Sequence, residues 1–428
     1  PIYDPTARTC FHFATPRADL VAARDALEYM PQTFHRPLVP RVAVMQGSQS
    51  CTIRGDRMTK LTRWRIALVP AALACQMAHA QSGITLYGIV DSSIRYMTNV
   101  DPAGDSKLVM GNGGMSESRW GMRGVEDLGG GWSTFFKLEN RFYLNTGQSD
   151  PTLPFFNEAQ VGIRSASYGQ VIIGRQFNVM IEGITIGGYG SNPWVPYDFS
   201  YQPEVTLSGG IWTSNQVQYQ AHFHDVMFSA AYAVGGVAGH TSYGSQYGAA
   251  MAYAPKGGPV SLGAAYEESK DSVNGSGSLA WTVGGSYTWD KTRFAVGYIV
   301  NQNDAGFSSF ANGPFTAAAL AALKYTDFSK RRMILGGITQ QIGAAWHLAA
   351  NVWRTLQDGK TAAQDGSAWQ YQLVADYALS KRTDVYLEGD YAQYHGDLIG
   401  AQLQGVNGIG LAQKSTQLGV MAGLRHTF

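Results

Sequence analysis

Residues 132–142 have the sequence WSTFFKLENRF, in which apolar and polar side chains alternate with a period of two. One parity carries Trp132, Phe136 and Phe142, and the other carries Lys137 and Arg141. A period of two is the pattern of a β-strand, because successive side chains point to opposite faces. The charges also lie deep within the segment rather than at its ends. We therefore expect a long strand with one apolar face and one charged face.

The same alternation recurs from residue 83 to the end of the chain. It predicts sixteen strands, at residues 83–96, 117–127, 131–144, 155–166, 169–177, 213–222, 225–234, 244–254, 258–268, 279–289, 291–303, 329–342, 344–356, 367–379, 382–395 and 414–428. A soluble sandwich also alternates, but it presents charges only outward on short strands. Strands of about ten residues, in an even number and with aromatic residues near their ends, are typical of barrels that cross a membrane.

The connections between these strands alternate between short and long. Short turns at 129–131, 167–169, 256–258 and 290–291 are expected to face the periplasm. Long loops at 97–116, 178–212, 304–328 and 396–413 are expected to face outward. Lipid offers no partner to a backbone amide, so the sheet has to close on itself. We expect an all-β fold, a 16-stranded antiparallel transmembrane β-barrel wide enough for an aqueous lumen.

Residues 58–80 have the three parts of a secretory signal peptide. A basic stretch follows Met58, the apolar run IALVPAALA comes next, and the small-residue cleavage site AHA precedes Gln81. Residues 1–57 precede this signal and show no strand alternation, so we interpret them as an upstream extension that packs against nothing. The mature barrel is then residues 81–428.

Composition and motifs exclude several other kinds of site. The formal net charge of +1 lacks the basic footprint of nucleic-acid binding. No cysteine follows Cys75, so the barrel has no disulfide framework or cysteine metal site. His222 and His224 stand two apart without a third ligand in view, and we expect no metal and no cofactor. The glycines at 129–131 lack the Lys of a phosphate loop, and no G-x-S-x-G motif occurs, so no catalytic residue is expected.

Five stretches of the chain resemble the general porins of Gram-negative bacteria, of the betaproteobacterial type found in Burkholderia, Bordetella and Neisseria. They are GITLYGIVDSSIRY at 83–96, SRWGMRGVEDLGGGW at 118–132, VGIRSASYGQVIIGRQF at 161–177, YALSKRTDVYLEGDY at 377–391 and GLRHTF at 423–428. The resemblance implies a homotrimer of barrels in the lipid bilayer of the outer membrane, each with a third loop that folds inward. The implied function is passive diffusion of small hydrophilic solutes and ions.

The candidate for the inward loop is residues 178–212, which follow the fifth predicted strand and are unusually long for a connection. This loop carries Glu182, Asp198 and Glu204 and no basic residue. Strand parity places cations on the lumenal wall: Arg95, Arg119, Arg123, Lys137, Arg141 and Arg164. We expect the acidic loop to face this basic wall across the narrowest part of the pore. Alternatively, each arginine is a structural partner of a lumenal carboxylate, such as Asp91, Glu139 or Glu158.

Two places depart from the pattern of the resembling porins. Those porins usually have Arg-Gln where this chain has Asn157-Glu158, and an arginine where it has Trp212. Residues 81–428 also carry 22 basic and 26 acidic side chains. We therefore place Glu158 on the acidic side of the constriction, and predict weak ion selectivity, slightly for cations.

Two other classes of protein remain compatible with the strand pattern. An outer-membrane barrel enzyme of the lipase type needs a serine and a histidine on the lipid-facing side, and no such pair stands out. A β-rich surface adhesin would be soluble without detergent.

If residues 58–80 are a signal peptide, the protein isolated from outer membranes should begin at Gln81. Intact-mass measurement of the purified protein tests this, because removal of residues 1–80 leaves one defined mass. Peptides from residues 1–57 in the membrane-extracted protein would contradict it.

Overall fold

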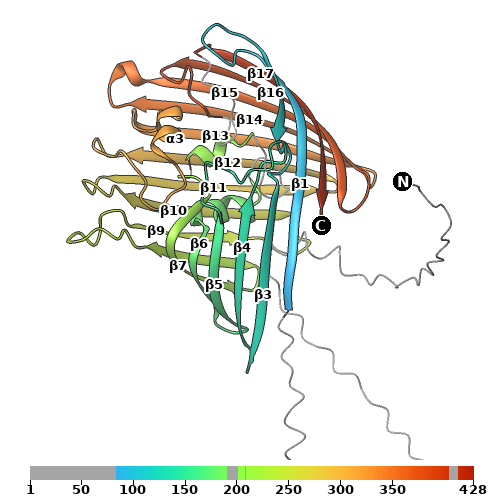
Figure 1. The fold of residues 1–428 in the computed structure, drawn as a ribbon, viewed down its shortest axis with the longest axis vertical. Helices are drawn as coiled ribbons and strands as arrows, with labels where there is room; N and C mark the ends of the chain where they lie inside the picture. Colours follow the sequence, from blue (N-terminus) through green and yellow to red (C-terminus); the bar gives the residue numbers. More distant parts are fainter. Residues whose placement is uncertain (1–82, 190–200, 208, 404–412) are drawn as a thin grey trace, which may run out of the picture. The chain divides into compact units, whose positions relative to one another are not determined.

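The computed structural model describes residues 83–189, 201–207, 209–403 and 413–428, and these are organised around one antiparallel sheet (Figure 1). The sheet contains seventeen strands within the described residues: β1 (Gly83–Met97), β2 (Lys107–Asn112), β3 (Arg119–Gly129), β4 (Trp132–Arg141), β5 (Glu158–Ser165), β6 (Gly169–Phe177), β7 (Trp212–Phe223), β8 (Val226–Ala233), β9 (Gln246–Tyr253), β10 (Val260–Lys270), β11 (Gly277–Trp289), β12 (Thr292–Asn303), β13 (Phe328–Ile342), β14 (Trp346–Gly359), β15 (Gly366–Ala378), β16 (Thr383–Gly396) and β17 (Thr416–Thr427).

Four short helical segments lie in the connections between these strands. They are α2 (Val179–Ile186), η1 (Pro203–Leu207), α3 (Ala317–Ala322) and η2 (Ala362–Gln364). Among the described residues, no helix combines the length and the apolar character needed to cross a membrane.

The sheet closes where the first and last strands meet. Residues 89–97 of β1 pair with residues 419–427 of β17, and Figure 1 shows the blue β1 beside the red end of the chain. Two further backbone hydrogen bonds extend this closure, from Gly88 N to Phe428 O at 3.1 Å and from Phe428 N to Gly88 O at 3.0 Å. The expected closed barrel is therefore confirmed.

The connection after β1 differs from the prediction. The sequence predicts one loop over residues 97–116, but β2 lies inside it. β2 pairs with residues 92–97 of β1, and β3 pairs with residues 83–89 of the same strand. β2 and β3 therefore lie one after the other along the same edge of β1 and count as one strand of the barrel, which makes the barrel sixteen-stranded. The short alternating stretch KLVMGN is too brief to stand out in the sequence, and it becomes a strand because β1 offers it a free edge.

Residues between β2 and β3 leave the wall and turn inward. Asp91 holds them, because its carboxylate accepts hydrogen bonds from Met115 N at 3.1 Å and Ser116 N at 2.7 Å. Tyr386 on β16 donates to the same carboxylate at 2.5 Å. The buried Asp91 on β1 thus holds the inward turn, and Ser93 and Arg425 add hydrogen bonds to Gly113 and Ser116.

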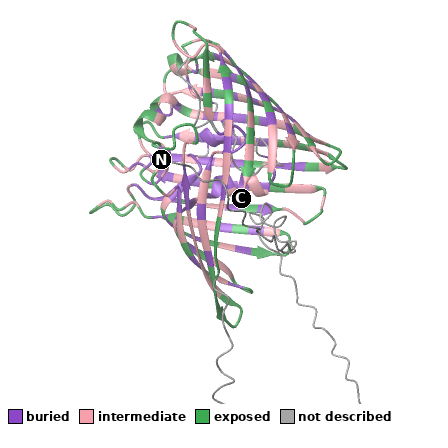
Figure 2. Cartoon of the chain, turned by 45° about the vertical axis from the view of Figure 1, so that its right-hand side comes forward, coloured by how far each residue is buried: buried purple, intermediate pink, exposed green. Residues whose placement is uncertain are grey.

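Side chains alternate between the two faces of the wall as the sequence predicts (Figure 2). On β16, Glu388 and Asp390 are buried on the inner face, whereas Leu387 and Tyr391 are exposed on the outer face. Exposed aromatic residues form two belts on the outer face. The belt at the long-loop end contains Tyr96, Tyr232, Tyr247, Tyr266, Trp369, Tyr371 and Tyr391, and the belt at the short-turn end contains Trp132, Tyr168, Tyr219, Tyr253, Tyr287, Trp289 and Trp346. Such belts mark the two interfaces of a bilayer.

The loop between β12 and β13 also packs inside the long-loop end of the barrel. Its aromatic residues Phe307, Phe310 and Tyr325 are buried together with Phe328 and Tyr394 of the wall. This packing narrows the long-loop end of the barrel from the side of β12–β16.

The closure at Gly88 leaves no room for a side chain. A Cβ at this position would overlap the ring of Phe428 and lie 2.7 Å from the carbonyl oxygen of Arg119. Gly88→Ala should therefore destabilise the folded barrel by about 1–3 kcal/mol, as overpacking does elsewhere. The measurement is the temperature at which the purified barrel loses its strand circular-dichroism signal.

Gly389→Ala is the matched control, because Gly389 also faces outward and no heavy atom lies within 4 Å of its added Cβ. Equal unfolding temperatures for the two variants would show that the Phe428 ring moves aside freely.

Candidate functional site

The long connection between β6 and β7 folds back into the barrel. Asn178 begins α2, since its side-chain oxygen accepts from Ile181 N at 2.9 Å and its amide nitrogen donates to Gly210 O at 2.8 Å. The apolar residues of α2 then pack on the inner face of β9 and β10, where Ala250 and Ala265 leave room for them. The expected inward folding of this loop is confirmed for its described residues.

The second half of the loop is anchored on the wall by β14. Glu204 of η1 accepts a hydrogen bond from the indole nitrogen of Trp353 at 2.9 Å, and both side chains are buried. The ring of Tyr201 lies 5.8 Å from the Trp353 ring, and Gln370 donates to the Tyr201 hydroxyl at 3.2 Å. Glu204, predicted to face the basic wall, thus has at least one of its oxygens directed at β14.

Glu182 of α2 is held in a similar way near the start of the loop. Its carboxylate accepts from Gln218 at 2.8 Å and from Ser229 at 2.7 Å, which lie on β7 and β8. Burial of this loop residue raises the pKa of its carboxyl to about 7, although both hydrogen bonds act in the opposite direction. Asp198, the third predicted loop acid, lies outside the described residues.

Strands β3–β5 carry a set of alternating basic and acidic side chains that we call the basic wall. Lys137 lies at its centre, with Nζ 2.8 Å from Glu158 and 3.5 Å from Glu139. Arg119 lies 3.9 Å from the same Glu139 carboxylate. Arg141 forms an ion pair with Glu117, a residue of the inward turn between β2 and β3. The predicted cations therefore share the wall with carboxylates.

The remaining predicted cations make other contacts. Arg95 lies 3.2 Å from Glu388 and 2.5 Å from Asp390, and all three side chains are buried. Arg123 lies over the ring of Tyr87 at 5.5 Å. Arg164 lies over the ring of Phe135 at 5.3 Å and donates weakly to Ser133 at 3.4 Å.

Trp212, where the resembling porins usually have an arginine, lies close to two guanidinium groups. Arg141 is 4.2 Å and Arg175 is 5.9 Å from the centre of its indole ring. Arg175 also donates to the Asn157 carbonyl at 3.0 Å and to the Ser214 hydroxyl at 2.7 Å. The indole offers these cations an attractive face without adding a charge.

Arg175 is absent from the sequence-based prediction because a β-bulge hides it. Simple alternation from Val171 and Ile173, both exposed, places Arg175 on the outer face. The register between β6 and β7 shifts between Gly174 and Gln176, and Gly174 has a φ of 130° that other residues rarely adopt. The contacts of Arg175 instead place it beside Trp212. A glycine within a strand is the only signal of such a bulge in the sequence.

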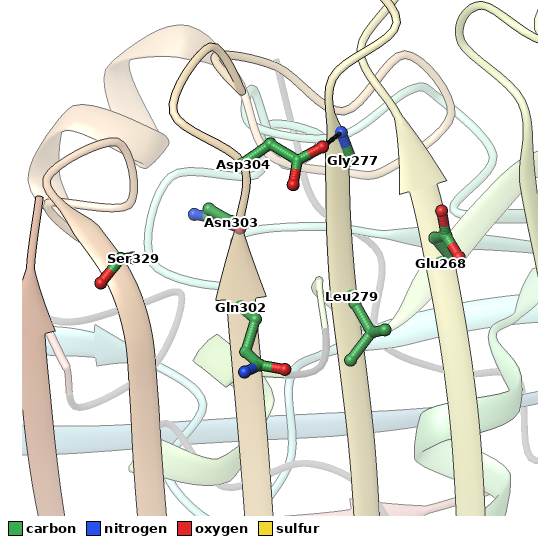
Figure 3. A pocket seen from close by; sticks show the side chains of 7 residues that line it. All are labelled: Glu268, Gly277, Leu279, Gln302, Asn303, Asp304 and Ser329. Atoms are coloured by element: carbon green, nitrogen blue, oxygen red, sulfur yellow. Dashed lines mark hydrogen bonds between the residues drawn. The ribbon is translucent and has the colours of Figure 1, made fainter.

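A separate hollow opens at the long-loop ends of β10–β13, and Figure 3 shows the side chains around it. It is lined by Glu268, Gly277, Leu279, Gln302, Asn303, Asp304 and Ser329. The lining contains a serine but no histidine, so it lacks the base of an esterase-type triad. No group of three or more His, Cys, Asp or Glu side chains in the described part of the chain could hold a metal ion.

Comparison with known proteins matches the chain to the family of Gram-negative porins over residues 67–397. The chain is 28% identical over 390 residues to outer membrane porin protein 32 of Delftia acidovorans, a match that covers 85% of this chain and 99% of that protein. It is 26% identical over 390 residues to an outer membrane porin protein of Bordetella pertussis, covering 82% and 96% of the two chains.

Solved structures show the same fold. The anion-selective porin from Comamonas acidovorans superposes with a TM-score of 0.65 at 25% identity, covering 81% of this chain and 100% of that one. OmpT of Vibrio cholerae shares the fold with a TM-score of 0.56 at 16% identity, covering 81% and 98%. The family match spans most of the barrel, and the wall closes with sixteen positions and an inward loop. The chain therefore belongs to the family of Gram-negative porins, which form water-filled diffusion channels in the outer membrane.

Proposed function

We propose that this porin passes small hydrophilic solutes and ions with weak charge selectivity. The observation that carries the proposal is the position of Lys137 between the carboxylates of Glu158 and Glu139. An ammonium flanked by two carboxylates adds no net positive charge to the lumenal wall. Arg119, 3.9 Å from Glu139, brings the summed charge of these four groups to zero, so this part of the wall favours neither sign of ion strongly.

The comparison with the Comamonas porin sharpens this proposal. That structure is described as anion-selective. This chain has Asn157, Glu158 and Trp212 at three positions where the resembling porins usually have Arg, Gln and Arg, which makes the local charge more negative. Wall charges act on an ion in the pore at distances below the Debye length of roughly 8 Å, so salt does not fully screen them. We infer that the anion preference of that relative is not carried over to this chain.

We assign the basic side of the constriction to the predicted cations of β3–β5, together with Arg175 from β6. The basic residues are Arg119, Arg123, Lys137, Arg141, Arg164 and Arg175, and the acidic residues are Glu158, Glu182, Asp198 and Glu204. Arg95 belongs to the pore lining in this proposal, but its two carboxylate partners make its contribution to selectivity small.

We also infer that three copies associate through the outer faces of β1 and β17. Leu86, Val420 and Phe428 are exposed there, at 62%, 48% and 45% of their surface, and Val90 lies among them. A contiguous apolar surface suits a subunit contact as well as lipid. We propose no catalytic role for the protein, because the hollow at β10–β13 lacks a histidine.

Purified protein should insert into planar bilayers with stepwise increases in conductance that often occur in threes. A trimer that inserts as a unit and closes one channel at a time gives this pattern. If folded protein inserts and closes only in single steps, never in groups of three, the trimer is contradicted.

The absence of a catalytic role has its own test. Release of fatty acid from phospholipid by the same preparation would contradict it.

Glu158→Gln should shift the zero-current potential across a tenfold KCl gradient toward anion selectivity. Removing one charge a few ångströms from the ion path changes its energy by roughly 0.5–1 kcal/mol in a watery pore, which alters the permeability ratio about two- to fivefold. The matched control is Glu126→Gln, which removes the same charge from an exposed position on the outward parity of β3. A shift as large in the control, or none in Glu158→Gln, would place Glu158 outside the constriction.

A further inference from the structure

The outer face of β13 and β14 carries three cations near the long-loop end. Lys330 and Arg332 alternate with the buried Arg331 and Met333, so they point away from the lumen. Arg354 alternates in the same way with buried neighbours on β14. We call Lys330, Arg332 and Arg354 the cationic patch. Because most outward side chains of β13 and β14 are apolar, these charges need a physical reason to be there.

The protein neutralises only part of the cationic patch. Arg332 donates two hydrogen bonds from Nη2 to the carboxylate of Asp358, at 2.6 and 2.8 Å. Within the described residues, no acidic group lies within 4.0 Å of Lys330 or Arg354. The Nε of Arg332 and one Nη of Arg354 are also shielded from solvent without a hydrogen-bond acceptor. Two net positive charges and several unused donors therefore remain on this face.

The aromatic neighbours of the cationic patch indicate how deep in the membrane it lies. The guanidinium of Arg354 lies 5.0 Å from the centre of the Trp369 ring, which is its cross-strand partner on β15. Trp369 stacks with Tyr371, and Tyr371 stacks with Tyr391, so all three belong to one continuous row of the long-loop belt. Aromatic belts lie at the headgroup level, where a cation is far better tolerated than at the midplane.

The register brings the three cations onto one small area. Lys330 and Asp358 are directly opposite each other on β13 and β14, and Arg332 is opposite Leu356. Arg354 lies two residues from Leu356, so Arg332 and Arg354 are diagonal neighbours, about 7–8 Å apart at their backbones. Arg332 is directed at Asp358 and Arg354 at Trp369, so both guanidinium groups lie at the same outer surface within the reach of long side chains.

We infer that the cationic patch binds the phosphate of a lipid headgroup in the outer leaflet. Guanidinium forks match the oxygens of a phosphate, and the two cations without a carboxylate partner supply the charge that attracts it. Trp369 offers an apolar surface to the part of the lipid below the phosphate. A second copy of this chain fits less well, because the outward residues of β1 and β17 include no carboxylate to meet the cations.

Native mass spectrometry of the full protein in detergent, titrated with phosphatidic acid, tests the inference. The parent protein should retain phosphatidic acid more tightly than phosphatidylcholine with the same acyl chains. Each cation near a membrane surface strengthens binding about fivefold, so Lys330→Gln, Arg332→Gln and Arg354→Gln together should weaken it about 100-fold. Arg354→Gln alone should weaken it about fivefold and leaves the Arg332–Asp358 pair intact.

The matched control replaces Lys256, Lys291 and Lys381 by glutamine, which removes three exposed charges from the short turns at the other end of the barrel. This control should bind phosphatidic acid like the parent, and channel conductance should report correct folding of every variant. Equal binding by the patch variants and the parent would overturn the inference, and so would binding of inorganic phosphate as tight as that of the lipid. Loss of the oligomer with unchanged lipid binding would assign the patch to a subunit contact instead.

Discussion

Closure of the hydrogen-bonded sheet is the constraint on which the rest of this structure depends. In lipid, an unpaired backbone amide or carbonyl has no alternative partner, so β1 and β17 have to meet. The pairing of residues 89–97 with 419–427 and the reciprocal bonds between Gly88 and Phe428 complete this ladder. Gly88 lacks a side chain because the terminal ring occupies that space. The inward loop and the lumenal charges are attached to this wall, so their positions depend on its closure.

Charged side chains are distributed differently on the two faces of that wall. Inside, cations and carboxylates from neighbouring strands and loops are combined, as Lys137, Glu139 and Glu158 show. Such groups compensate one another's charge, so their burial is tolerated. Outside, the described strands have apolar side chains at their middle and charges only near the belts. Glu182 and Glu204 of the inward loop also accept hydrogen bonds from side chains of the barrel wall, so polar contacts of this kind also hold the loop inside the pore.

Strand parity in the sequence predicted much of this architecture, because a period of two is a local property. It placed Arg119, Lys137 and Arg141 on the inner face, and their contacts with inner-face carboxylates agree with that parity. It did not identify β2, whose strand character depends on the free edge of β1. It did not identify Arg175 as a lumenal residue, because the bulge after Gly174 changes the register only through pairing with β7. The partner of Arg141 was equally hidden, since Glu117 comes from an inward turn that Asp91 holds.

The buried cluster of Arg95, Glu388 and Asp390 has a consequence for the order of assembly. Its members are separated by 293 and 295 residues, yet they lie on β1 and β16, on either side of β17. Contacts at such long separation form only after the intervening chain is already ordered. Until β17 pairs with β1, the guanidinium group of Arg95 is separated from the carboxylates of Glu388 and Asp390, and the sheet has an open edge. Closure of the barrel is therefore favoured by ion pairing as well as by backbone hydrogen bonds, since an unclosed barrel retains three charges that only water can solvate.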